Sequence, residues 1–143
     1  MTIIVDSSVV VKWFVDEDHS AEALNLRSGS LAAPELLMVE CVNVFWKKTR
    51  KSEMDEARVR PAIEALTLFG LDLWPAARLA DRAFEIARTL DHAVYDCFYL
   101  ALAERLAAPL VTADTRLINK LAAARGPTDI RLVSLEQAVS LTR

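Results

Sequence analysis

Glycine and cysteine are scarce in this sequence, and their scarcity excludes several kinds of active site. Only three glycines occur among 143 residues, so there is no glycine-rich phosphate loop and no GxSxG turn for a nucleophilic serine. The two cysteines, Cys41 and Cys97, form no CxxC pair, and both fall in stretches that predict buried helices. We therefore expect reduced core thiols rather than a disulfide framework or a zinc site.

The chain also lacks a surplus of positive charge and a long apolar run. Its net charge is -3, which is no overall basic signature for nucleic acid, so any such contact must come from a local patch. The N-terminus MTIIVDSS has no basic leader and reaches Asp6 too early for a signal peptide. Acids interrupt every apolar run well before the ~18 residues of a membrane span. We expect a soluble, cytoplasmic protein.

Short apolar stretches alternate with longer helical ones, which is the pattern of an α/β fold. The five predicted strands lie near 2–5, 31–33, 71–74, 109–113 and 130–133. The pattern predicts one domain over residues 1–143, with a central parallel sheet of about five strands covered by helices on both faces. Pro34 is expected in the first turn of a helix, Gly126-Pro127 in a loop, and Ser134 with Gln137 in a capping box.

Four acids stand where a charge is expensive, at strand ends or inside apolar helices. Asp6 follows the first predicted strand in IIVDSS, and Asp114 follows the fourth in LVTADTRL. Glu40 lies in the helical segment APELLMVECVNVF, and Asp96 has apolar neighbours on every side. Right-handed crossovers place the carboxyl ends of parallel strands on one rim of the sheet, where both helices also start. We therefore expect the four carboxylates to converge.

Converging carboxylates cannot all stay ionised without a cation, because their mutual repulsion raises their pKa values. Oxygen ligands favour Mg²⁺ or Mn²⁺ over zinc, and His19 and His92 are neither spaced nor placed as a zinc pair. Such an ion binds phosphate oxygens, so the four acids predict metal-dependent hydrolysis of phosphodiester bonds. Thr112 lies two residues before Asp114, on the same strand face. It either orients a carboxylate or a water, or is an ordinary strand residue.

The densest basic cluster ends the helix that carries Glu40, and we call it the basic edge. It consists of Lys47, Lys48, Arg50 and Lys51. Cations are favourable at the negative end of a helix, which explains part of the cluster without any function. Four cations in five residues exceed what helix capping needs, so contact with phosphates or with a protein partner stands as the alternative.

Together, Asp6 in IIVDSS, Glu40 in APELLMVECVNVF, Asp96 in YDCFYLALAERL and Asp114 in LVTADTRL resemble the PIN domain, and within it the VapC-type toxins of bacterial toxin–antitoxin pairs. The resemblance covers the whole chain. It implies a Mg²⁺- or Mn²⁺-dependent endoribonuclease that cuts structured RNA such as tRNA or rRNA, with the four acids as catalytic metal ligands. It also implies a homodimer, silenced by a cognate VapB-type antitoxin that binds near the active site.

Two other functions compete with this interpretation. An aspartate after the first strand also begins the sites of phospho-aspartate phosphatases of the haloacid-dehalogenase type and of receiver domains. A dehalogenase-like phosphatase needs a second acid where this chain has Ser8, and a receiver needs a lysine where Val133 and Ser134 stand. A PIN-like module that binds RNA or a partner without cutting is the non-enzymatic alternative. Metal-dependent cleavage of RNA would separate it from a nuclease.

Overall fold

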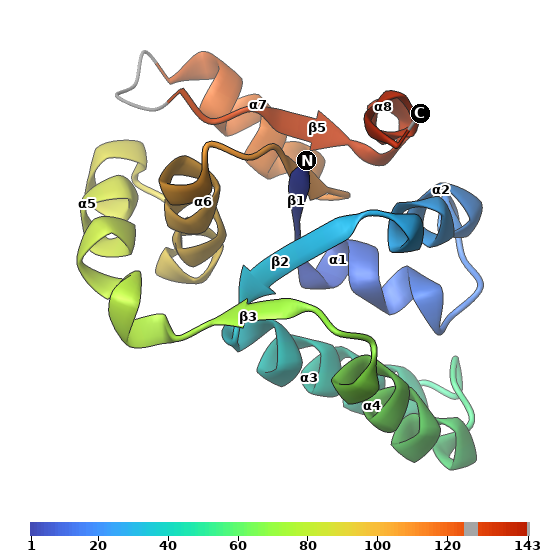
Figure 1. The fold of residues 1–143 in the computed structure, drawn as a ribbon. Coiled ribbons are helices and arrows are strands. Elements are labelled where there is room, and N and C mark those ends of the chain that lie inside the picture. Colours follow the sequence, from blue (N-terminus) through green and yellow to red (C-terminus); the bar gives the residue numbers. More distant parts are fainter. Residues whose placement is uncertain (125–128, 143) are drawn as a thin grey trace.

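A five-stranded parallel sheet forms the centre of the computed structural model, which describes residues 1–124 and 129–142 (Figure 1). The strands lie in the order β3-β2-β1-β4-β5, and every neighbouring pair is parallel. They are β1 (Thr2–Val5), β2 (Ser30–Pro34), β3 (Asp72–Trp74), β4 (Leu110–Thr112) and β5 (Leu132–Ser134). The predicted fold class is confirmed. The loop expected at Gly126-Pro127 lies outside the described residues.

Helices cover both faces of the sheet. Figure 1 shows α5 and α6 on one side of β1, and α1 and α2 on the other. The helices are α1 (Ser7–Val10), α2 (Ser20–Asn25), α3 (Leu36–Arg50), α4 (Val59–Leu68), α5 (Ala80–Leu90), α6 (Val94–Leu106), α7 (Thr115–Ala123) and α8 (Leu135–Ala138). Within the described residues, none of them is long and apolar enough to cross a membrane.

The central strand β1 is buried on both faces. Ile3, Ile4 and Val5 are at most 2% exposed, and α6 packs against β1 and both strands beside it. Their branched side chains fit the pleated strand. A continuous apolar run, rather than an alternating one, is typical of a parallel strand covered on both faces. The residue that follows this strand, Asp6, is therefore attached directly to a buried strand of the core.

The order of the strands reverses at β1. The chain passes from β1 to β2 and β3 on one side, and then continues with β4 and β5 on the other side. In open α/β sheets, ligands bind in the crevice outside the carboxyl ends of two strands that flank such a reversal. Asp6 directly follows β1, and Asp114 comes two residues after β4. The fold thus places both acids at this crevice.

The end of β2 differs from the prediction. Pro34 is the last residue of β2 and pairs in register with Trp74, while α3 begins at Leu36. The expected place of Pro34 in the first turn of the helix is therefore wrong. Proline is tolerated here because the next amide takes over the ladder, with Glu35 N donating to the carbonyl oxygen of Trp74 at 2.8 Å.

Two other local predictions are confirmed. The Ser134 hydroxyl accepts from the backbone amide of Gln137, and the Gln137 side chain accepts from the amide of Ser134, which is the expected capping box at the start of α8. Cys41 and Cys97 are free thiols in the core. Burial, followed by nearby acidic charge, raises the pKa of Cys41 to about 12, so this thiol stays protonated and inert.

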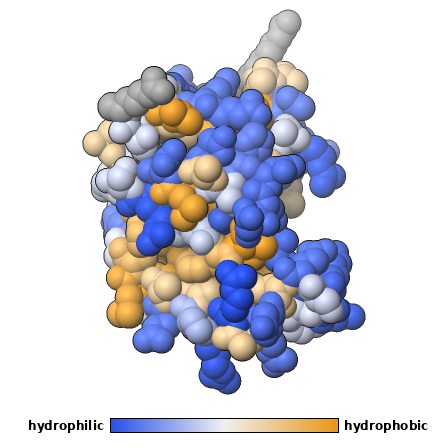
Figure 2. All heavy atoms as spheres, turned by 90° about the vertical axis from the view of Figure 1, so that its right-hand side faces the viewer, coloured by the Kyte–Doolittle hydropathy of each residue, from blue (hydrophilic) through white to orange (hydrophobic). Residues whose placement is uncertain are grey.

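The surface is mainly hydrophilic with local apolar areas. On the face viewed from the α2 side, hydrophobic side chains gather in the lower half (Figure 2). On α3, Val39, Val42 and Trp46 are 68%, 39% and 53% exposed. Their spacing places them along one side of the helix. Glu40 lies about 100° or more around the helix from each residue of this apolar stripe, so it faces a different side of α3.

Candidate active site

Asp6 is fixed at the start of α1 by hydrogen bonds to both of its carboxylate oxygens. Oδ1 accepts from the Ser8 hydroxyl at 2.5 Å and from the Val9 amide at 3.3 Å, and Oδ2 accepts from the Thr112 hydroxyl. The residue is only 7% exposed. Burial raises the pKa of Asp6 to about 6, against the effect of these hydrogen bonds, and the charge of Asp96 adds to the rise.

Glu40 lies within α3 and is held by a tyrosine from α6. Its Oε1 accepts from the Tyr99 hydroxyl at 2.6 Å, and Tyr99 is 2% exposed. Burial raises the pKa of Glu40, the hydrogen bond from Tyr99 lowers it, and the charge of Asp96 raises it. Burial and the charge of Glu40 raise the pKa of Tyr99 well above its ordinary value. The phenol therefore stays protonated and acts as a donor.

Asp96 stands in the first turn of α6, beside a histidine that precedes the helix. Its Oδ2 lies 2.6 Å from His92 Nε2, and the side chains of His92 and Asp96 are 15% and 31% exposed. The charge of Asp96 reaches both Asp6 and Glu40, because it raises the pKa of each. The structure thus brings three of the four predicted acids into one electrostatic neighbourhood.

Asp114 is joined to this neighbourhood through the backbone rather than through its carboxylate. Its Oδ1 caps α7, accepting from the amides of Arg116 at 3.0 Å and Leu117 at 3.3 Å. Its own amide donates at 3.0 Å to the Thr112 hydroxyl, which in turn donates to Asp6. Thr112 is fully buried. It links the segments after β1 and β4, as expected of a residue that orients a carboxylate.

The donor set fits a hard divalent cation. Among the described residues, the four acids form no ion pair with a lysine or arginine, and only His92 lies beside one of them. No three His, Cys, Asp or Glu side chains of the described residues are grouped tightly enough to hold one ion. Mg²⁺ keeps several of its waters and needs only one or two direct carboxylates. Carboxylate oxygens that repel one another, with no protein cation between them, suit such an ion.

Three residues of the site are missing from the set that the sequence predicted. They are Ser8, His92 and Tyr99. Ser8 lies two residues after a strand-terminal aspartate, and a search for hydroxyls beside a helix cap would have found it. His92 precedes Asp96 by four residues but lies outside the helix, and Tyr99 is 59 positions from its partner. No local pattern points to these last two.

One lysine of the basic edge is engaged in an ion-pair cluster. Glu17 accepts from Lys12 at 3.1 Å and from Lys48 at 3.2 Å, which ties the turn after α1 to α3. Burial acts to raise the pKa of Glu17, but the hydrogen bonds and charges of Lys12 and Lys48 outweigh it, so the pKa lies below its usual value. Lys48 therefore contributes to packing and is the least available of the four cations.

The other members of the basic edge face solvent. Lys47, Arg50 and Lys51 are exposed, and within the described residues none of them forms an ion pair with a carboxylate. The guanidinium of Arg50 lies over the ring of Trp46, 4.9 Å from its centroid. These three charges are open to an anionic partner.

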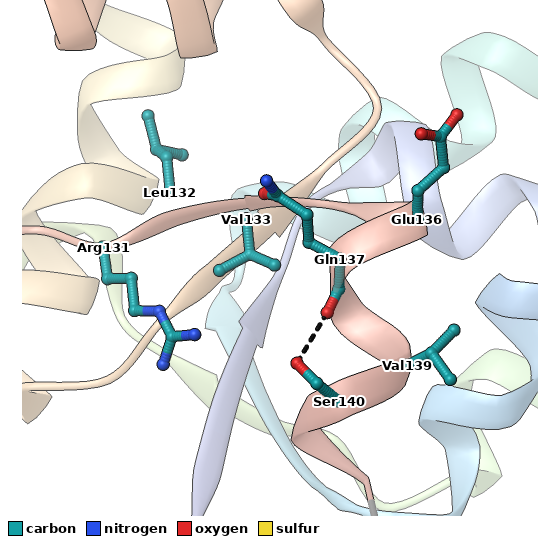
Figure 3. A pocket seen from close by; sticks show the side chains of 7 residues that line it. All are labelled: Arg131, Leu132, Val133, Glu136, Gln137, Val139 and Ser140. Atoms are coloured by element: carbon teal, nitrogen blue, oxygen red, sulfur yellow. Dashed lines mark hydrogen bonds between the residues drawn. The ribbon is translucent and has the colours of Figure 1, made fainter.

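A cavity of about 590 Å³ lies elsewhere, beside β5 and α8 (Figure 3). Its polar groups come from Arg131, Glu136, Gln137 and Ser140, and none of the four acids lines it. Two of these groups already serve the helix: the Ser140 hydroxyl donates to the Gln137 carbonyl at 2.8 Å, and Gln137 completes the capping box. This cavity has no arrangement for catalysis, and the acids at the crevice remain the candidate active site.

The chain is similar in sequence and in fold to several known proteins. The family model described as PIN domain matches residues 3–123. Ribonuclease VapC1 of Mycobacterium tuberculosis is 34% identical over 134 residues, which are 91% of this chain and 96% of VapC1. The crystal structure of PAE2754 from Pyrobaculum aerophilum has a TM-score of 0.74 and 20% identity, covering 99% of this chain and 89% of that one. A toxin–antitoxin complex from Klebsiella pneumoniae contains a similar fold, with a TM-score of 0.62 and 17% identity over 93% of this chain and 97% of that one.

Proposed function

Because the chain belongs to the PIN domain family, we propose that it is an endoribonuclease and acts as the toxin of a toxin–antitoxin module. One observation carries the proposal. Asp6, Glu40 and Asp96 share one electrostatic neighbourhood at the crevice, and no lysine or arginine of the described residues pairs with them. A relative that covers nearly the whole chain is named a ribonuclease, and carboxylates of this kind suit metal-dependent phosphodiester hydrolysis.

Asp6, Glu40, Asp96 and Asp114 would hold the ion, which is Mg²⁺ or Mn²⁺. When bound, the ion supplies the positive charge that activates a water and neutralises the phosphate. The chain's own residues prepare for it: Ser8 and Thr112 fix the orientation of Asp6. Burial raises the pKa of Asp6 and of Glu40. Binding of the ion should therefore release protons, and it should grow tighter as pH rises through the raised pKa values of these two carboxyls.

The substrate class follows from the family resemblance and from the surface charge. Structured RNA such as tRNA or rRNA is the expected target, and the exposed cations of the basic edge would bind its phosphates. Lys47 lies seven residues after Glu40 on α3, which is about 10 Å along the helix axis. That separation is too large for both to contact one phosphate, so the edge would hold phosphates that flank the cleaved bond.

The proposed partners are a VapB-type antitoxin and a second copy of this chain, in the cytoplasm. Val39, Val42 and Trp46 form an exposed apolar stripe on the helix that also carries Glu40, which would suit the binding of a protein partner. The solved complex from Klebsiella pneumoniae joins a protein of the same fold to its antitoxin. An antitoxin that binds this stripe would have to extend around α3 toward Glu40 to block the site.

The test is to incubate purified, antitoxin-free protein with tRNA and rRNA in Mg²⁺ or Mn²⁺ and to sequence the RNA ends. Discrete cuts are expected, and they should disappear with EDTA and with Asp96→Asn. Cuts that persist in either control would refute the metal-dependent nuclease. Tight RNA binding without any cut, in the presence of either ion, would support the non-enzymatic module instead.

A further inference from the structure

Three of the four carboxylates of the site follow a common pattern in which the protein holds one oxygen and leaves the other free, whereas both oxygens of Asp6 accept hydrogen bonds. Tyr99 holds Oε1 of Glu40, His92 holds Oδ2 of Asp96, and two amides hold Oδ1 of Asp114. Within the described residues, the second oxygen of each of these three carboxylates accepts no hydrogen bond. No side-chain oxygen of the described residues is both buried and unpartnered. The three free oxygens are therefore open to solvent.

Two of the three holding groups are side chains from one segment of the chain. His92 directly precedes the N-cap of α6, and Tyr99 lies within this helix. Both contacts are short, 2.6 Å in each case. Short bonds to a charged acceptor are stronger than bonds between neutral groups and restrict the rotation of the carboxylate. The same segment thus fixes one acid of α3 and one of its own.

Resting on the proposed metal-dependent nuclease, we propose that His92 and Tyr99 are positioning residues, which hold one oxygen each of Asp96 and Glu40 and leave the other oxygen free for the divalent cation. Partners that orient metal ligands in this way are part of most metal sites, because a ligand that must first be ordered binds more weakly. Neither residue needs to touch the ion or the RNA. Their effect passes through the two acids.

A purely structural role would give a different result. The ring of Tyr99 fills the core, whereas the one side-chain hydrogen bond of its hydroxyl within the described residues goes to Glu40. Tyr99→Phe removes this hydroxyl and keeps the ring. His92→Leu removes the donor to Asp96, and His92→Gln returns an N–H donor of similar reach. The chain offers matched controls in Tyr95, which is 63% exposed on the same helix, and in the exposed His19.

The experiment measures the affinity of Mn²⁺ alone by titration calorimetry, together with thermal unfolding in EDTA and the kinetics of RNA cleavage. Tyr99→Phe and His92→Leu should bind Mn²⁺ about 10- to 100-fold more weakly than wild type. Their kcat should fall while KM for RNA stays unchanged. His92→Gln should recover most of the affinity, and Tyr95→Phe and His19→Leu should match wild type.

Mn²⁺ affinities of Tyr99→Phe and His92→Leu equal to wild type would overturn the proposal, and so would a His92→Gln as weak as His92→Leu. Wild type that binds no Mn²⁺ would overturn it as well. If Tyr99→Phe is unfolded in EDTA, the two His92 variants decide the outcome. The Mn²⁺ titration contains no RNA, so it tests the positioning role separately from the nuclease. If the variants lose Mn²⁺ affinity as expected but the wild-type protein cuts no RNA, the positioning role is upheld and the nuclease is refuted.

Discussion

Replacing Asp6 by asparagine should make the metal-free protein more stable at neutral pH, although it removes an acid of the active site. Asp6 is 7% exposed, and its carboxylate lies near the charge of Asp96. Asparagine has nearly the same shape and carries no charge. Its oxygen can still accept from Ser8 and Val9, while its amide group must donate to a reoriented Thr112 hydroxyl.

The magnitude follows from the pKa of Asp6, which burial raises from 3.8 to about 6. A folded pKa above the unfolded one means that the group contributes stability below pH 3.8, and that this contribution is lost as pH rises through about 6. The full loss is about 3 kcal/mol, of which about 2 kcal/mol develops between pH 4.5 and 8. An imperfect hydrogen bond in the variant would offset about 1 kcal/mol of the gain.

The assay is urea unfolding in EDTA between pH 4.5 and 8, with Asp16→Asn, an exposed acid outside the helices and strands, as the matched control. The stability of Asp6→Asn relative to wild type should rise by about 2 kcal/mol across this range, and the control should follow wild type. Adding Mn²⁺ should stabilise wild type and the control more than the variant. If the difference in unfolding free energy between Asp6→Asn and wild type does not change with pH, the conclusion that Asp6 is a buried carboxyl with a raised pKa is refuted.

Three further predictions concern charges at and around the site. Asp96→Asn should abolish RNA cleavage yet leave the metal-free protein as stable as wild type or more stable, because it removes a charge that repels Asp6 and Glu40. Retained cleavage together with a clear loss of melting temperature would make Asp96 a structural residue. Replacing Lys47 and Lys51 by glutamine should weaken RNA binding and flatten its salt dependence by about one unit of log–log slope per lost phosphate contact. The rate of cleavage at saturating RNA should be nearly unchanged. An unaltered salt slope would refute the RNA-holding role, and antitoxin binding would be the next assay. Glu17→Gln should lose up to about 1 kcal/mol at pH 7. That loss should shrink as pH falls through the lowered pKa of Glu17, and urea unfolding at a series of pH values from 7 down to 3 would detect it.

Much of the fold is predictable from the sequence because its signals are local. Branched apolar residues mark β1, β4 and β5. The apolar content of β1 already indicates a strand covered on both faces. The place of Pro34 was not predictable, because its tolerance in β2 depends on an amide that pairs with the neighbouring strand. Local propensity carries no information about which strand will be that neighbour.

The candidate site is predictable to the level of positions but not of side-chain partners. The four acids stand out because a charge at a strand end or in an apolar helix is costly. The partners of these acids depend on contacts across the chain, such as Tyr99 with Glu40 and Thr112 with Asp6. Asp114 shows the remaining ambiguity, since a carboxylate before a helix suits both a metal site and a cap, and here it forms the cap.

The two strand-end acids differ in how much of their presence the fold itself explains. Asp114 is half-buried and caps α7, and a cap alone accounts for an aspartate there. Asp6 also caps its helix, but serine or asparagine would cap as well without placing a charge in the core. The buried carboxylate of Asp6 instead costs about 3 kcal/mol at neutral pH when no cation is present. A residue that lowers stability in this way requires a reason outside the fold, and a cation held at the crevice would supply one, because it would offset the same charge that burial penalises.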